Sequence, residues 1–144
     1  MAEWRYSHVH LNSADMPKAV EFYKRMFGAR VVGESPWHGG RITTSLDING
    51  MRVLISNKLY PLESTPLSEI PEPHLGLEHF GLETDDLDAA ARDLRAKGAE
   101  FIMEPHEFRP GQWIAFIRAP DGVRIELTEP KLRKTIPTES RQGA

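Results

Sequence analysis

Two histidines and one glutamate are the residues whose types and spacing could do chemistry. His8 and His79 lie 71 residues apart, each in a segment of alternating polar and apolar residues, and Glu126 lies in the last such segment. Two imidazoles and one carboxylate form a ligand set that leaves coordination positions of a divalent ion open. Open positions distinguish a catalytic metal ion from a structural one. We therefore expect His8, His79 and Glu126 to bind one divalent ion (Fe, Mn, Zn, Ni or Co).

The composition agrees with nitrogen and oxygen ligands and excludes several other classes of protein. The 144 residues include no cysteine, which excludes disulfides, thiolate nucleophiles and iron–sulfur clusters. A net charge of −3 offers no basic surface for nucleic acid or anionic lipid. No apolar stretch approaches the roughly 18 residues of a membrane span, and the N-terminus lacks the pattern of a signal peptide. We expect a cytoplasmic protein with no nucleic-acid partner and no membrane partner.

The elements that must position these residues begin with a strand over residues 4–12. Its alternation places His8 and His10 on one face, so both side chains point into the same space. Asp15 is a typical helix N-cap, and Gly28 is a typical residue to end the helix that follows. Three short strands come next, over residues 30–34, 41–48 and 51–56, and Asn49-Gly50 predicts a tight hairpin between the last two.

The second half of the chain repeats this order of elements. A strand over 76–84 and a capped helix over 85–98 precede three strands, and equivalent landmarks lie 70 to 72 residues apart. We predict an α+β fold in which two βαβββ modules in tandem form a curved mixed sheet that encloses a metal-binding cup. The whole chain, 1–144, is then a single domain, made of module one at 4–57, a proline-rich linker at 58–74, module two at 75–128 and a polar tail at 129–144.

Strand geometry suggests which other side chains line the cup. If Asp121-Gly122 is a two-residue turn, Glu126 faces Ile117, and Trp113 and Ala115 share its side of the sheet. The same reasoning places one set of residues on the cup side of module one: Thr43, Ser45, Asp47, Arg52 and Ser56.

Substrate contacts are expected from this lining and from the loops beside it. Trp37 and His38 precede Gly39-Gly40 in a segment that could close over the cup. We predict substrate contacts from Trp37, His38, Arg52 and Trp113. His10 is the residue we expect to move a proton during catalysis.

Three stretches of the sequence resemble a known family. They are SHVHLNSADMPKAVEFYKRMFGARVV, LEHFGLETDDLDAAARDLRAKGAEFI and FIRAPDGVRIELTEP. Together they look like the two modules of the vicinal oxygen chelate superfamily, also called the glyoxalase/bleomycin-resistance/dioxygenase family, over residues 4–128. The resemblance implies that His8, His79 and Glu126 bind the metal ion, which acts as a Lewis acid on two neighbouring oxygens of a small substrate.

The resemblance leaves three functions open. Leu54 stands where glyoxalase I and methylmalonyl-CoA epimerase usually have a fourth ligand, so a literal glyoxalase I is not expected. The first function is a glyoxalase-like lyase or isomerase working through a metal-chelated enediolate. The alternatives are an Fe(II) extradiol-type ring-cleaving dioxygenase and a metal-free, bleomycin-resistance-like protein that sequesters a ligand. Family members often form dimers, and a homodimer is expected here.

Overall fold

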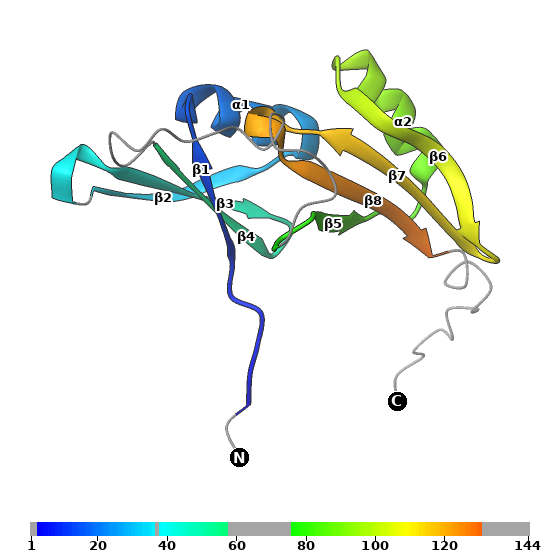
Figure 1. Ribbon diagram of the computed structural model, residues 1–144, viewed down its shortest axis with the longest axis horizontal. Helices are drawn as coiled ribbons and strands as arrows, with labels where there is room; N and C mark the ends of the chain where they lie inside the picture. The colour runs from blue at the N-terminus through cyan, green and yellow to red at the C-terminus, as the bar shows by residue number, and fades with distance from the viewer. Residues whose placement is uncertain (1–2, 37, 58–75, 131–144) are drawn as a thin grey trace, which may run out of the picture. The chain divides into compact units, whose positions relative to one another are not determined.

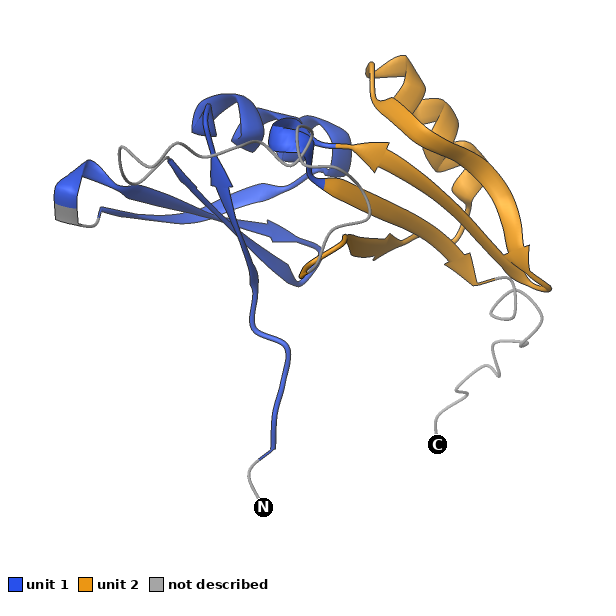
Figure 2. Ribbon diagram, in the orientation of Figure 1, with its two compact units in different colours: residues 1–74, 119–123 blue, residues 75–118, 124–144 orange. Residues whose placement is uncertain are grey.

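The structure is a computed structural model that describes residues 3–36, 38–57 and 76–130 (Figure 1). Trp37, the predicted linker and all but the first two residues of the predicted tail lie outside these ranges. The chain divides into two compact units (Figure 2). The first unit comprises residues 1–74 and 119–123, and the second comprises residues 75–118 and 124–144.

The first unit contains a four-stranded mixed sheet and one helix. The strands lie in the order β1-β4-β3-β2, with β1 parallel to β4 and the other neighbours antiparallel. The elements are β1 (Val9–Ser13), α1 (Met16–Phe27), β2 (Arg30–Pro36), the 3-10 helix η1 (His38–Gly40), β3 (Ile42–Ile48) and β4 (Met51–Asn57).

Helix α1 begins and ends where the sequence predicts. Asp15 Oδ1 accepts a hydrogen bond from the backbone N–H of Lys18 at 3.2 Å, and Gly28 ends the helix with φ of 64°. The helix packs on one face of the sheet, where the Thr44 hydroxyl contacts Met16 Sδ. Because neighbouring residues of a strand point to opposite faces, Thr43 and Ser45 lie on the face away from α1.

The Asn49-Gly50 hairpin sets the register of the first sheet. Both residues have positive φ, 48° and 93°, as a tight hairpin turn of this kind requires. Thr43 therefore pairs with Ser56 and Asp47 pairs with Arg52, so these residues share one face of the sheet. We call the side of the sheet away from α1 the first polar face; it carries His10, Asn12, Thr43, Ser45, Asp47, Arg52, Leu54 and Ser56.

The second unit repeats this architecture. Its strands lie in the order β5-β8-β7-β6, with β5 parallel to β8. Asp86 caps α2, and the buried Glu129 accepts a second hydrogen bond at the same helix end, from Leu87 N at 2.6 Å. The elements are β5 (Phe80–Glu83), α2 (Leu87–Ala96), β6 (Glu100–Arg109), β7 (Gln112–Arg118) and β8 (Arg124–Pro130), with the 3-10 helix η3 (Pro120–Gly122) counted in the first unit.

The predicted α+β class and the two βαβββ modules are confirmed, with one four-stranded sheet in each module. Neither helix in the described ranges has the length and apolar character needed to cross a membrane.

Two strands start later than predicted. Alternating polar and apolar residues indicate an extended backbone, but a β-strand also needs a neighbouring strand to pair with, and the alternation does not show where that pairing begins. His8 and His79 therefore each precede the first residue of a strand, β1 and β5 respectively.

The predicted register between β7 and β8 is wrong by one residue. Their connection is the five-residue segment 119–123 rather than a two-residue turn, so Glu126 pairs with Phe116, and Ile117 pairs with Ile125. A slip of one residue moves every side chain to the other face. Trp113 and Ala115 consequently lie on the face opposite to Glu126.

Candidate functional site

The second unit brings two of the three predicted metal ligands together. His79 Nε2 lies 3.1 Å from Glu126 Oε2. Both side chains keep some exposure, 31% and 23%, so a small ion can reach them. The ring of Phe116, the cross-strand partner of Glu126, stands edge-on to the His79 ring at 5.0 Å between centroids and an angle of 89°. Packing against Phe116 thus fixes the plane of the imidazole.

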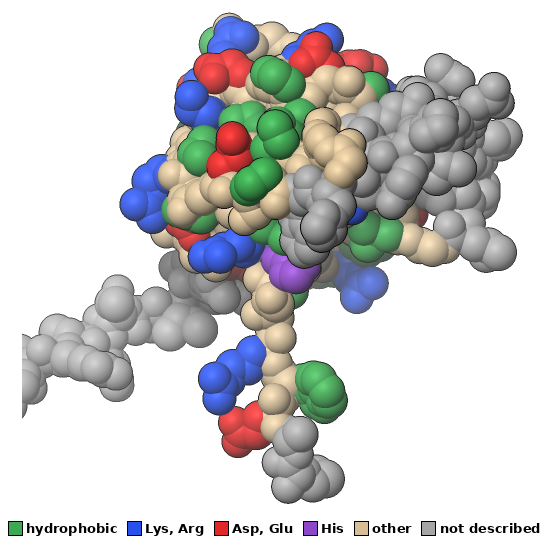
Figure 3. Space-filling model, turned by 90° about the vertical axis from the view of Figure 1, so that its left-hand side faces the viewer, with side chains coloured by type: hydrophobic (Ala, Val, Ile, Leu, Met, Phe, Trp, Pro, Cys, Tyr) green, Lys and Arg blue, Asp and Glu red, His purple; other side chains and the backbone are tan. Residues whose placement is uncertain are grey.

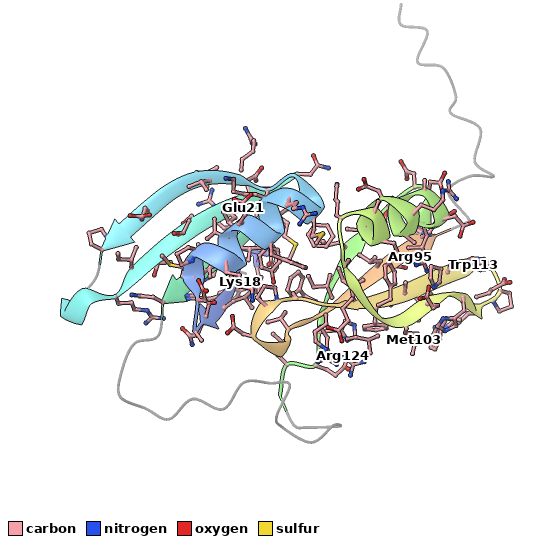
Figure 4. All side chains as sticks on the ribbon, turned by 90° about the horizontal axis from the view of Figure 1, so that it is seen from above. Lys18, Glu21, Arg95, Met103, Trp113 and Arg124 are labelled. Atoms are coloured by element: carbon pink, nitrogen blue, oxygen red, sulfur yellow. The ribbon has the colours of Figure 1, made fainter. Side chains whose placement is uncertain are left out.

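Glu78 and Arg124 hold the other side of the same imidazole. The Glu78 carboxylate contacts His79 Nδ1 through Oε2, and its Oε1 accepts from Arg124 Nη1 at 2.6 Å. Arg124, labelled at the start of β8 in Figure 4, also lies over the Phe116 ring at 5.1 Å. A continuous polar chain therefore runs from Arg124 through Glu78 and His79 to Glu126.

The geometry of this polar chain is compatible with a bound divalent cation. Each ring nitrogen of His79 faces a carboxylate oxygen, but a neutral imidazole carries only one N–H. If Nδ1–H donates to Glu78, the Nε2 lone pair and Glu126 Oε2 face each other and repel. A cation bound by both removes that conflict. Metal bonds of about 2.0–2.2 Å put adjacent ligand atoms roughly 3.0–3.4 Å apart, which brackets the separation seen here.

His8 lies in the first unit, 71 positions before His79 in the sequence. It belongs to an extended segment, residues 3–8, that projects ahead of β1 with hydrophobic and charged side chains near its end (Figure 3). The His8 side chain is exposed, with Nδ1 2.9 Å from Ser7 Oγ. Within the ranges that the structure describes, no group of three His, Asp or Glu side chains that could hold a metal ion is assembled. The three-ligand set therefore stays a prediction.

His10 heads a second polar chain, on the first polar face. Its Nε2 lies 2.6 Å from Ser56 Oγ, which lies 2.7 Å from Thr43 Oγ1, and both hydroxyl residues are buried. Partial burial lowers the pKa of His10, and the charges of Arg41 and His8 lower it further. The imidazole is therefore neutral near pH 7. A neutral ring held at one nitrogen can accept a proton at the other.

The four residues predicted to contact the substrate lie in different parts of the chain, and the structure describes only two of their side chains. Arg52 is exposed on the first polar face and pairs across the strands with Asp47. Trp113 is half-buried at the start of β7, far along the β7–β8 hairpin from Arg124 (Figure 4). Trp37 lies outside the described residues, and only the backbone of His38 is described, in η1.

Sequence reasoning missed two residues of these sites. Glu78 adjoins a predicted ligand, and an acid next to a metal-binding histidine was a signal that could have been read. Arg41 was not singled out because nothing in the sequence indicated that it would reach Asn12 on β1.

Residues 5–127 match the sequence model of the Glyoxalase/Bleomycin resistance protein/Dioxygenase superfamily, and the chain belongs to this family. The predicted family membership is thereby confirmed. No curated protein is similar enough in sequence to count as a match.

Solved structures of the family share the fold. A glyoxalase family protein from Bacillus cereus is 20% identical over 90% of this chain and 95% of its own, with a TM-score of 0.75. The fosfomycin resistance protein FosX from Mesorhizobium loti is 21% identical over 93% and 97%, with a TM-score of 0.67. Glyoxalase I from Zea mays is 21% identical over 85% of this chain but 43% of its own, with a TM-score of 0.70. At these identities the likeness is one of fold.

Proposed function

We propose that the protein is a metal-dependent, glyoxalase-like lyase or isomerase that acts on a small substrate with two neighbouring oxygens. The observation that carries the proposal is the pair His79 Nε2 and Glu126 Oε2, 3.1 Å apart and accessible, with a carboxylate behind the imidazole. Family membership supports it.

Each residue has a role in this proposal. His8, His79 and Glu126 would hold the ion, which supplies a Lewis acid for the two oxygens of the substrate. Glu78 accepts the Nδ1–H of His79 and so keeps Nε2 unprotonated for the ion. His10, neutral near pH 7, accepts the substrate proton at Nδ1 while its Nε2–H donates to Ser56 Oγ. The Ser56 hydroxyl can donate to Thr43, so the orientation of the imidazole is fixed from behind.

Elemental analysis of the purified protein tests the proposal directly. We expect one equivalent of Mn, Co, Ni or Zn per chain, either as purified or after reconstitution, and conversion of a hydroxyketone or hydroxyacid without oxygen. Bound iron with oxygen uptake would point instead to the ring-cleaving dioxygenase. No stoichiometric ion after reconstitution with each metal would overturn the enzyme and leave the ligand-sequestering function.

Replacing Glu78 with Gln should weaken metal binding by about 10- to 100-fold without unfolding the protein. The amide keeps the shape of the side chain but loses the charge that orients and supports the imidazole, and losses of this size follow changes to such supporting groups. Calorimetric titration with Zn²⁺ measures the effect. Glu83→Gln, on β5 of the same unit, is the matched control and should bind as wild type. Equal affinity of the two variants would show that Glu78 does not act on the ligand.

We also propose that the protein works as a homodimer in the cytoplasm, as the family resemblance and the composition suggest. Sedimentation velocity at micromolar concentration should give twice the chain mass of 16.3 kDa. A monomer under these conditions would contradict the dimer.

A further inference from the structure

Arg124 is a half-buried arginine at the first residue of β8, and two of its contacts lead to His79. Its Nη1 donates to Glu78 Oε1 at 2.6 Å, and its guanidinium carbon lies over the Phe116 ring, 5.1 Å from the ring centroid. Glu78 Oε2 contacts His79 Nδ1, and the Phe116 ring packs edge-on against the His79 ring. One side chain therefore touches both groups that orient the imidazole.

The contacts of Arg124 all lie within the second unit and next to the ligand pair. Phe116 pairs in register with Glu126, and Arg124 lies two residues before Glu126 on the same strand. Because every second residue of a strand points to the same face, these three side chains share one face of the sheet. Arg124 thus reaches His79 from the side opposite to the Nε2 that faces Glu126.

An arginine at this position carries an electrostatic cost. Arg118 is the cross-strand partner of Arg124, and like charges directly opposite each other on neighbouring strands are destabilising. Each guanidinium has its own acid, since Arg118 Nε donates to Glu100 Oε1 at 3.2 Å while Arg124 pairs with Glu78. A positive charge near a cation site also opposes the ion that the site would bind. Charge alone would therefore disfavour an arginine here, and its contacts must compensate.

We propose that Arg124 is a positioning residue of the metal site: by holding Glu78 and Phe116, it keeps the His79 ring oriented, with its proton on Nδ1, so that Nε2 is presented to the ion. The inference rests on the proposed function and adds a residue to it. A guanidinium suits this role because its N–H groups bind a carboxylate while its planar face packs on an aromatic ring. The ammonium group of a lysine is a point charge on a flexible stem and lacks that planar face.

The sign of one measurement separates positioning from an effect of charge alone. Arg124→Gln removes a positive charge near the ion, so charge alone would strengthen the binding of Zn²⁺. Loss of positioning should instead weaken it by about 10-fold, as expected for a group that supports a metal-binding histidine indirectly. Arg124→Lys should recover part of the affinity. Calorimetric titration with Zn²⁺ measures these differences, and the absorption spectrum of bound Co²⁺ should change in Arg124→Gln.

Arg118→Gln is the matched control, because it removes the same charge from the cross-strand neighbour, whose acid is Glu100. It should bind Zn²⁺ at least as tightly as the wild type. In the Glu78→Gln background, Arg124→Gln should have a smaller effect, since two residues that act through one contact are not additive. Binding by Arg124→Gln as tight as that of the wild type, or tighter, would overturn the inference. If circular dichroism shows that Arg124→Gln does not fold, wild-type affinity in a folded Arg124→Lys variant would overturn it instead.

A measurement on the metal-free protein distinguishes failure of this inference from failure of the proposed function. Nitrogen NMR of the histidine rings, with His79 assigned by comparison with His79→Ala, reports which ring nitrogen carries the proton. We expect Nδ1–H in the wild type and a mixture of both tautomers in Arg124→Gln. This result in a protein that binds no ion would refute the metal enzyme and retain the role of Arg124. A protein that binds Zn²⁺ equally well with and without Arg124, and keeps one tautomer in both, would do the reverse.

Discussion

His79→Ala should bind Zn²⁺ or Co²⁺ at least about 100-fold more weakly than the wild type while keeping its fold. The variant removes Nε2, which lies 3.1 Å from Glu126 Oε2. Loss of a group that merely supports a ligand costs about 10–100-fold, so loss of the ligand itself should cost more. The variant also removes the imidazole ring that contacts both the Glu78 and the Glu126 carboxylate, so nothing from residue 79 then lies between these two negative charges.

The stability of this variant should change little, because the His79 ring is only partly buried and its contact with Phe116 is an edge. The absorption spectrum of bound Co²⁺ provides a readout of ligation that does not depend on activity. His106→Ala is the matched control, since His106 lies on β6 of the same unit and its Nδ1 lies 2.9 Å from the carbonyl oxygen of Glu104. Unchanged metal affinity and an unchanged cobalt spectrum in His79→Ala would mean that the ligand set is misassigned.

The pairing of His79 with Glu126 could be predicted from the sequence because it depends on topology. In a βαβββ module the first strand lies parallel to the last, so residues at the start of one and in the middle of the other become neighbours. The repeat of 70 to 72 residues, the caps at Asp15 and Asp86 and the Asn49-Gly50 turn all gave consistent local signals. Such agreement between local preference and global fold is what makes a prediction dependable.

Features that depend on a single residue of register or on a side-chain rotamer could not be predicted. The Asp121-Gly122 pair looked like a two-residue turn, but both residues have positive φ inside a longer connection, and the register moved by one. Because of this one-residue difference in register, Trp113 lies on the face of the sheet opposite to Glu126. The contact from Arg41 to Asn12 spans 29 positions and involves a long flexible side chain, and no local pattern encodes it.

The connection that shifted the register also supports the first unit. Asp121 Oδ2 accepts from Ser13 Oγ at 2.6 Å, and its Oδ1 accepts from Ala14 N at 3.0 Å. Ser13 Oγ in turn accepts from Asp15 N, at the residue that caps α1. A carboxylate from late in the chain thus holds the junction between β1 and α1. Sequence analysis assigned Asp121 only a turn, because its partners lie more than 100 positions away.

Asp121→Gly should lower the free energy of unfolding by about 2 kcal/mol, because hydrogen bonds to a charged acceptor contribute about 1.5–3 kcal/mol and this acceptor is only partly buried. Glycine tolerates the φ of 63° at this position, so the loss reports the hydrogen bonds and not backbone strain. Asp121→Ala should cost about 1 kcal/mol more, since an alanine in the left-handed region is strained.

Urea unfolding followed by tryptophan fluorescence and circular dichroism measures these differences. Asn49→Gly is the matched control: Asn49 also has positive φ in the equivalent hairpin of module one, but it is exposed and makes no such clamp. It should stay within about 0.5 kcal/mol of the wild type. If Asp121→Gly behaved like Asn49→Gly, the segment 119–123 would be an ordinary turn. If it is destabilised as expected, the stability of module one depends on a residue of the second repeat.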